Sequence, residues 1–248
     1  MLPKVIEKEP KSGDAKQCAQ TAHPWLVQCC FGALLSSHKP LVDTDSGFVA
    51  GNYYDKYHSK NPLARYLMDG FLDAVVSLTN KISPKDVHEI GCGEGHLTGA
   101  LAAKGRRLRG SDVSEEVVAV ARQAAMTAGF TAEFKATSIY DLQPATDGAE
   151  FIVCCEVLEH LDDPKKAVEH LSKLAKPYLL TSVPREPIWR AMNMARGKYW
   201  SDLGNTPGHL QHWSKGSFLT MLRDHFEILE VRSPLPWTVA LCRSKYKL

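Results

Sequence analysis

Apolar residues recur along most of the chain with the periods of helices and strands. A helical period follows Asn61-Pro62, where asparagine suits the cap of a helix and proline suits its first turn. Its apolar positions are Leu63, Leu67, Phe71, Val75 and Leu78. By contrast, Phe151–Cys155 is a continuous apolar run, as expected of a strand that is covered on both faces. The chain therefore contains segments of both kinds.

Capping residues and apolar runs place the other elements. Ser114 precedes a helical segment that has two acids in its first turn, where they favour the helix dipole, and Gly129 ends it. Two more helices are expected after Asp163 and Ser214. The other expected strands are 107–111, 132–137, 178–183, 226–231 and 239–243.

A glycine-rich turn stands directly after a strand-like run that ends at Ile90. The turn reads Gly91-Cys-Gly-Glu-Gly95, and a helix-like segment, residues 96–104, follows at once. A strand, a tight glycine turn and a helix start form the entrance of a nucleotide-binding βαβ unit. The glycines let the backbone turn sharply and let a ligand lie directly on it.

The spacing of these glycines and the acids around them indicate which ligand binds. The third glycine comes one residue earlier than in the G-x-G-x-x-G turn that binds a dinucleotide. Glu89 and Glu94 would repel a pyrophosphate, but they suit a ligand that carries an ammonium and a sulfonium. Asp112 ends the next strand-like run, where an acid accepts the hydroxyls of an unphosphorylated ribose. These features predict S-adenosylmethionine as the ligand.

Three stretches together carry a family resemblance. Glu89–Gly95, Ser111–Ser114 and Cys155–Leu161 resemble the class I S-adenosylmethionine-dependent methyltransferases, and the resemblance covers about residues 50–248. It implies a doubly wound, Rossmann-like α/β fold with a seven-stranded, mostly parallel sheet and a C-terminal antiparallel hairpin. It also implies S-adenosylhomocysteine as the product of the reaction.

The motifs and the resemblance give a set of expected cofactor contacts. In this family an acid often follows the third strand and meets the adenine, but Ser138 stands there in this chain, which leaves that contact open. Ile139 or Tyr140 is then the candidate to pack on the adenine face. The expected cofactor-binding residues are Glu89, Gly91, Cys92, Gly93, Gly95, Asp112, Val113, Ser138, Ile139, Cys155 and Glu156.

The chain divides into two parts and an insertion. Residues 1–50 are expected to be an N-terminal extension, either partly ordered or a cap over the substrate entrance, and residues 51–248 the methyltransferase domain. An aromatic run at 52–58 is either a segment that closes over the cofactor or an ordinary connector. Residues of about 185–213 lie outside the minimal fold and are rich in aromatic residues and methionine, which predicts a lid over the acceptor.

Two kinds of chemistry fit the polar residues near the predicted site. His209 or His212, on the expected lid, is a candidate base that would take a proton from the acceptor. Alternatively, Glu156, Glu159 and His160 would lie on one side of a helical turn and bind Mg²⁺ or Mn²⁺, and His209 or His212 would complete the coordination shell. That pattern resembles ubiquinone-pathway O-methyltransferases and small-RNA 2′-O-methyltransferases. The favoured interpretation is without a metal, with these residues bordering the cofactor and packing the next helix.

Composition and net charge limit the classes of binding partner and the expected cellular location. The net charge of +2 is too small to indicate nucleic acid or an anionic membrane, and no apolar run has the length of a membrane span. Seven cysteines without a disulfide or zinc spacing favour a cytoplasmic protein. We expect a small-molecule acceptor and a monomer or homodimer.

The leading hypothesis is methyl transfer to oxygen or nitrogen of a small molecule such as a secondary metabolite, a quinone precursor or a sugar. The alternatives are a metal-dependent 2′-O-methyltransferase of RNA ends and a non-catalytic S-adenosylmethionine-binding regulatory module. A nicotinamide oxidoreductase shares the strand–turn–helix unit but is disfavoured by the glycine spacing.

Overall fold

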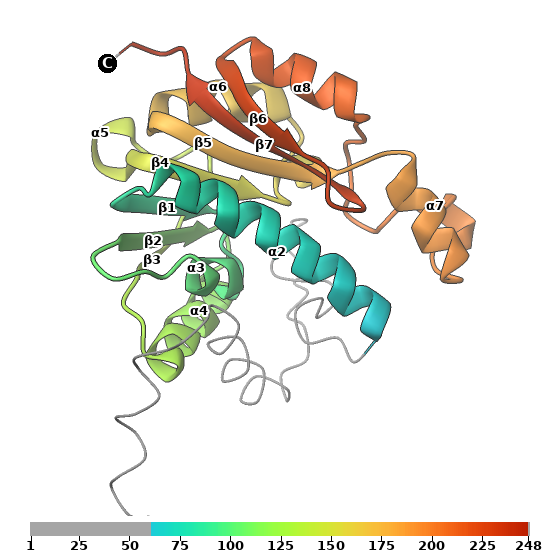
Figure 1. The fold of residues 1–248 in the computed structure, drawn as a ribbon, viewed down its shortest axis with the longest axis horizontal. Helices are drawn as coiled ribbons and strands as arrows, with labels where there is room; N and C mark the ends of the chain where they lie inside the picture. Colours follow the sequence, from blue (N-terminus) through green and yellow to red (C-terminus); the bar gives the residue numbers. More distant parts are fainter. Residues whose placement is uncertain (1–60, 248) are drawn as a thin grey trace, which may run out of the picture.

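A computed structural model describes residues 61–247. This part of the chain forms one seven-stranded sheet in the order β3-β2-β1-β4-β5-β7-β6 (Figure 1). The strands are β1 (Asp86–Ile90), β2 (Arg107–Asp112), β3 (Glu133–Ala136), β4 (Ala149–Cys155), β5 (Ala175–Pro184), β6 (Phe226–Arg232) and β7 (Trp237–Ser244). β7 runs antiparallel to both of its neighbours, and the pairs from β3 to β5 are parallel. The doubly wound fold with its closing hairpin is confirmed.

Helices cover both faces of this sheet. They are α2 (Pro62–Ile82), α3 (His96–Ala100), α4 (Glu115–Ala128), α5 (Pro144–Asp147), α6 (Pro164–Leu174), α7 (Ile188–Ala195) and α8 (Lys215–Arg223), with 3₁₀ turns η1 (Leu158–His160) and η2 (Trp200–Asp202). The predicted caps are in place, because Asn61 and Ser114 each accept a hydrogen bond from the first turn of the helix that follows.

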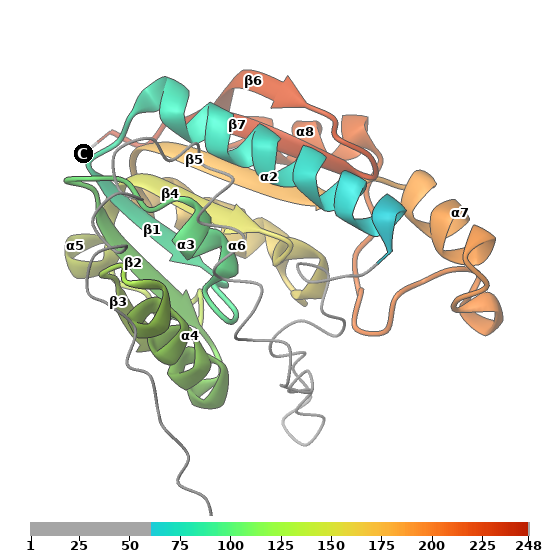
Figure 2. The same cartoon turned by 60° about the horizontal axis from the view of Figure 1, so that its bottom comes forward.

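The alternation of side chains along β4 explains why its whole run is apolar. Phe151 and Val153 face the α2 layer, whereas Ile152 and Cys154 face the layer of α6 and α8. Figure 2 shows α2 and α6 on opposite sides of the sheet. Each face therefore has its own hydrophobic core.

The sheet topology creates a crevice at one edge. Chain order reverses at β1, which pairs with β2 on one side and β4 on the other, and ligands of open α/β sheets bind outside the carboxyl ends at such a switch point. Because β7 is antiparallel, its first residue, Trp237, pairs with Pro184 at the end of β5. A side chain from near the C-terminus thus reaches the same edge.

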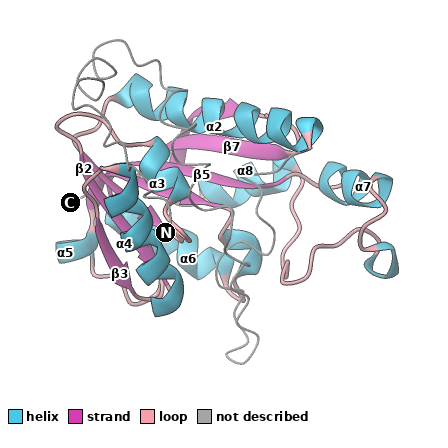
Figure 3. Cartoon of the chain, turned by 90° about the horizontal axis from the view of Figure 1, so that it is seen from below, coloured by secondary structure: helices cyan, strands magenta, loops and turns pink. Residues whose placement is uncertain are grey.

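The segment between β5 and α8 extends beyond this edge. It contains α7 and η2, and Figure 3 shows α7 standing apart from the sheet. A parallel bridge between Arg185 and Trp213 closes the two ends of the segment, which we name the insertion. It matches the predicted range of 185–213, and its function as a lid remains a prediction.

One prediction differs from the structure, and two others lie outside the described residues. The helix expected over 96–104 ends at Ala100, because the chain turns at 101–106, where Gly105 has a φ of +78°. The extension 1–50 and the aromatic run 52–58 lie outside the described residues. Among the helices of residues 61–247, none has both the length and the apolar character that a bilayer crossing requires.

Candidate active site

Two adjoining cavities lie at the carboxyl edge of the sheet. The first, of about 380 Å³, surrounds the glycine turn and is named the turn cavity. The second, of about 510 Å³, lies between α2 and the insertion and is named the insertion cavity. Glu156 and His160 line both cavities, so they mark the place where the two meet.

The glycine turn has the backbone shape that the sequence predicts. Gly91 has a φ of +75° and Gly93 a φ of +52°, in the left-handed region that favours glycine. The amides of Gly91 and Cys92 donate to the carbonyl of Ser111, at 2.7 and 2.9 Å, which joins the turn to β2. A Cβ at Gly93 would meet no atom within 4 Å, so its bare face is open toward a ligand.

Asp112 stands opposite this turn at the end of β2. Its Oδ2 accepts a hydrogen bond from the amide of Gly93, at 2.9 Å, and its Oδ1 accepts one from the amide of Ser114, at 3.3 Å. Burial raises the pKa of Asp112, and the backbone amides oppose that shift. The carboxylate lines the turn cavity, and it also fixes the turn.

Glu89 is the most deeply buried acid of the turn cavity, with 4% of its surface exposed. The hydroxyl of Thr98 on α3 donates to its carboxylate. Burial raises the pKa of Glu89 to about 8, and the charge of Asp112 adds to the shift. At neutral pH the carboxyl group of Glu89 is therefore protonated. A cationic ligand beside it would favour loss of that proton.

Glu156 follows β4 in a backbone conformation that the sequence does not reveal. Its φ is +61°, which is rare for a residue with a side chain and is common at functional sites. Its carboxylate accepts hydrogen bonds from Ser182 Oγ, at 3.0 Å, and from Trp237 Nε1, at 2.6 Å. The expected helical turn therefore does not begin at Glu156, and the prediction that Glu156, Glu159 and His160 share one helical turn is wrong. All three nevertheless line the insertion cavity, and their role as metal ligands remains a prediction.

Two of these residues lie close to His209, which the sequence offered as a further ligand. Potential ligand atoms of Glu159, His160 and His209 lie within 4.8 Å of one another. The insertion creates this cluster, because the amides of Leu210 and Gln211 donate to the carbonyl of Glu159, at 2.8 and 3.0 Å. The rings of His160 and His209 meet edge to face, with centroids 4.9 Å apart. One carboxylate and two imidazoles are a donor set that suits a divalent cation.

The two candidate bases differ in position. His209 is 9% exposed, lines the insertion cavity and stacks on Trp189 with ring centroids 5.7 Å apart. His212 is exposed and pairs its Nε2 with Oδ1 of Asn205, at 2.7 Å, and it lines neither cavity. The geometry favours His209.

Most predicted cofactor residues come together around the turn cavity. Its lining includes Glu89, Gly91, Cys92, Gly93, Asp112, Val113, Ser138, Ile139, Cys155 and Glu156. Gly95 does not line it, because this glycine caps α3 and packs against Ala121 of α4. Whether the lining residues bind a cofactor remains a prediction.

The sequence does not single out several other residues of this region. Thr98 and Ser182 contact acids of the site through side chains that no motif marks, and Trp237 comes from the closing hairpin. Only the topology could have indicated Trp237, because an antiparallel last strand begins at the carboxyl edge of the parallel strands.

The strand order and the helices on both faces of the sheet define a Rossmann-like methyltransferase fold. A magnesium protoporphyrin IX methyltransferase from Synechocystis with bound SAH is similar to the chain, with a TM-score of 0.59 and 21% identity over 75% of this chain and 89% of that one. The N-methyltransferase NodS from Bradyrhizobium japonicum gives a TM-score of 0.54 and 20% identity, over 73% and 98% of the two chains. At these identities the likeness concerns the fold alone.

Sequence comparison adds the family. Residues 62–230 match the family described as "Methyltransferase domain", and the chain belongs to that family. A ubiquinone biosynthesis O-methyltransferase from Actinobacillus pleuropneumoniae is 34% identical over 135 residues, which cover 52% of this chain and 57% of the relative. Another from Methylococcus capsulatus is 29% identical and covers 66% and 72%. The chain thus spans little more than half the length of the first of these relatives.

Proposed function

We propose that this protein transfers a methyl group from S-adenosylmethionine to oxygen or nitrogen of a small molecule. The observation that carries the proposal is the pair of cavities that meet at Glu156 and His160. A donor in the turn cavity and an acceptor in the insertion cavity would present their reacting atoms to each other at that junction. A methyl transfer requires this in-line approach, and positioning supplies much of its rate.

The turn cavity fits the donor chemically. Glu89 and Asp112 supply carboxylates beside a glycine turn with an open face, which suits a ligand that carries ammonium, sulfonium and ribose hydroxyl groups. Two solved structures of the Synechocystis enzyme have bound SAH or SAM. S-Adenosylmethionine would supply the methyl group, and this chain would orient it against the acceptor.

His209 is the proposed base. It lines the insertion cavity, and its ring is fixed between Trp189 and His160. Imidazole titrates near neutral pH, so His209 would take the proton of an acceptor hydroxyl or ammonium as the methyl group arrives. The relatives named as ubiquinone biosynthesis O-methyltransferases support an oxygen acceptor.

A divalent cation is the alternative means of removing the proton from the acceptor. Glu159, His160 and His209 would hold Mg²⁺ or Mn²⁺, and the metal would lower the pKa of an acceptor hydroxyl. Calorimetric titration of each metal into protein saturated with S-adenosylhomocysteine tests this proposal. Binding that disappears in Glu159→Gln favours the metal, whereas no binding to the wild type leaves His209 as the base.

The proposed function is tested by calorimetric titration of S-adenosylhomocysteine. We expect Asp112→Ala to weaken binding by about tenfold or more, because the ribose loses its carboxylate and the turn loses its anchor. Asp141→Ala is the matched control, since Asp141 is exposed and lines neither cavity. An affinity equal in both variants would contradict the assignment of Asp112.

Domain limits and location follow as smaller proposals. We assign residues 51–248 to the methyltransferase domain, residues 1–50 to an extension, and the insertion to a lid. A cytoplasmic location is supported by the free thiols of Cys92, Cys154, Cys155 and Cys242, which are all buried. Sedimentation of the purified chain would decide between the monomer and the homodimer.

A further inference from the structure

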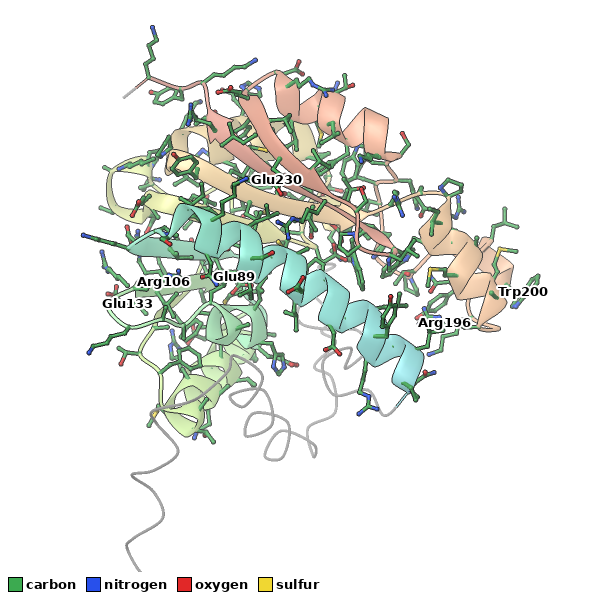
Figure 4. All side chains as sticks on the ribbon, in the orientation of Figure 1. Glu89, Arg106, Glu133, Arg196, Trp200 and Glu230 are labelled. Carbon is green, nitrogen blue, oxygen red and sulfur yellow. The ribbon has the colours of Figure 1, made fainter. Side chains whose placement is uncertain are left out.

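The insertion cavity has opposite charges at its two ends. Glu156 and Glu159 stand at the inner end, toward the turn cavity, whereas Arg196 and Lys198 follow the end of α7 on its exposed side. No other lysine or arginine of residues 61–247 lines this cavity. In Figure 4, Arg196 lies between α7 and the N-terminal end of α2, while Trp200 points outward.

A relay of hydrogen bonds through the buried Asn193 holds the side chain of Arg196, which is itself exposed. Its Nη2 donates to Oδ1 of Asn193, which is 1% exposed. The amide of Asn193 in turn donates to Thr206 Oγ1, at 3.1 Å, and that hydroxyl accepts the indole N–H of Trp189, at 2.9 Å. All four residues line the insertion cavity. The guanidinium is thus pre-oriented at the cavity, which lowers the entropic cost of binding a ligand.

Helix capping does not explain this arrangement. The last carbonyls of α7 already accept backbone amides: Arg196 donates to Met192, Gly197 to Met194, and Lys198 to Asn193. The guanidinium bonds a side chain instead. Within the described part of the chain, no carboxylate forms an ion pair with Arg196. Four of its five N–H groups remain beyond the contact with Asn193.

The middle of the cavity is apolar. Leu67 and Met68 line it from α2, and Trp189 and Trp237 line it with ring centroids 5.8 Å apart. A volume of about 510 Å³ suits a small organic molecule with a ring or a short chain. A molecule with such an apolar middle would have one end beside Glu156 and Glu159 and the other end beside Arg196.

We propose that the acceptor is an amphipathic organic anion, whose carboxylate or phosphate binds Arg196 with Lys198 beside it. This inference rests on the proposed function, because it names the acceptor of that site. The fork of N–H groups on the guanidinium matches two oxygens of a carboxylate or a phosphate, and the inner carboxylates repel the same anionic group. The charge pattern therefore orients the acceptor, with its neutral reacting end at Glu156 and His160 and its anion at the outer end.

The test uses ring-matched probes in calorimetric titrations of full-length protein saturated with S-adenosylhomocysteine. The probes are 4-hydroxycinnamate, its neutral amide 4-hydroxycinnamamide, and 4-hydroxybenzylphosphonate. We expect the carboxylate or the phosphonate to bind about tenfold tighter than the amide, or more. Whichever anion binds tighter identifies the group as a carboxylic acid or a phosphate ester.

Variants separate a contact from a structural effect. Arg196→Gln should reduce the preference for the anion to about threefold or less while the affinity for the amide stays the same. Arg223→Gln is the matched control, because it removes the same charge from an exposed residue of α8 that lines neither cavity. It should keep the full preference.

Three results would overturn the inference: anions that bind no tighter than the amide, an equal loss for all probes in Arg196→Gln, or an equal loss of preference in Arg223→Gln. S-Adenosylhomocysteine is titrated first, and a failure at that step counts against the proposed function. If that step fails, the anions and the amide are compared on the protein without S-adenosylhomocysteine, so the acceptor class is judged separately from the proposed function.

Discussion

Glu89 shows how one buried residue connects the cofactor site to stability. Burial raises its pKa to about 8, from 4.5 in the unfolded chain. Between about pH 4.5 and 8 the native protein therefore binds more protons at this site than the unfolded protein. The free energy of unfolding should fall as the pH rises through this window and become level above it.

Glu89→Gln should remove this dependence, because glutamine still accepts the hydrogen bond of Thr98 but does not titrate. Urea unfolding at about pH 5 and pH 8 measures the difference between the two pH values. We expect the wild type to lose on the order of 3 kcal/mol more than the variant over this range. Equal losses would show that Glu89 is ionised in the native state.

The glycine turn offers a pair of matched substitutions. Both Gly91→Ala and Gly93→Ala force alanine into a left-handed conformation, at about 1–2 kcal/mol each. Only at Gly91 would the new Cβ also clash, because it would lie 2.2 Å from Val157 Cγ2. Gly91→Ala should therefore have the lower melting temperature. Gly93→Ala should fold but bind S-adenosylhomocysteine at least about tenfold more weakly, since its methyl group enters the cavity.

Thermal unfolding and calorimetry of the two variants test this pair. Equal melting temperatures would contradict the clash with Val157. An unchanged affinity in Gly93→Ala would show that the ligand does not lie on the turn.

At the scale of elements, the insertion depends on Asn193. This buried side chain donates to the carbonyl of Gly204, at 2.9 Å, and to Thr206 Oγ1. Asn193→Ala would leave both acceptors without that donor, a loss of about 1–3 kcal/mol. We expect amide hydrogen exchange across 188–204 to accelerate by about tenfold or more, while exchange in β1, β4 and β5 stays unchanged.

Asn80→Ala, at an exposed asparagine of α2, is the control and should leave the exchange of the insertion as it is. Acceleration throughout the sheet in Asn193→Ala would mean that the insertion and the core unfold as one unit.

The elements also show what the sequence can reveal. The strand, the glycine turn and Asp112 are encoded within short stretches, and the predicted order of strand, turn and helix start, with Asp112 at the end of the next strand, is confirmed. The setting of Glu156 is not local, because Trp237 lies 81 residues further along the chain and only the antiparallel β7 brings it to the site. His209, and not His212, joins Glu159 and His160 through backbone contacts of the insertion, and the spacing along the chain does not decide between these two histidines.

At the scale of the whole molecule, the two cavities share a junction but have separate walls. Gly93 lines only the turn cavity, on the switch point of the sheet, and Trp189 lines only the insertion cavity, outside the sheet. The cofactor site therefore depends on the sheet, whereas the acceptor site depends on how α2 and the insertion lie together. Damage to one site should leave the other intact.

Ligand-induced stabilisation measures this independence. S-Adenosylhomocysteine at about a hundred times its dissociation constant should add about 2.7 kcal/mol, which raises the melting temperature by about 5–10 °C for a chain of this size. Trp189→Ala should start from a lower melting temperature, because it removes contacts with Trp237 and His209, yet keep the full increase. Gly93→Ala should lose about half of the increase or more at the same ligand concentration, because binding weakened about tenfold leaves the ligand at only about ten times its dissociation constant. If Trp189→Ala lost it too, the insertion would be part of the cofactor site, and the acceptor would have to bind against a surface that the cofactor helps to build.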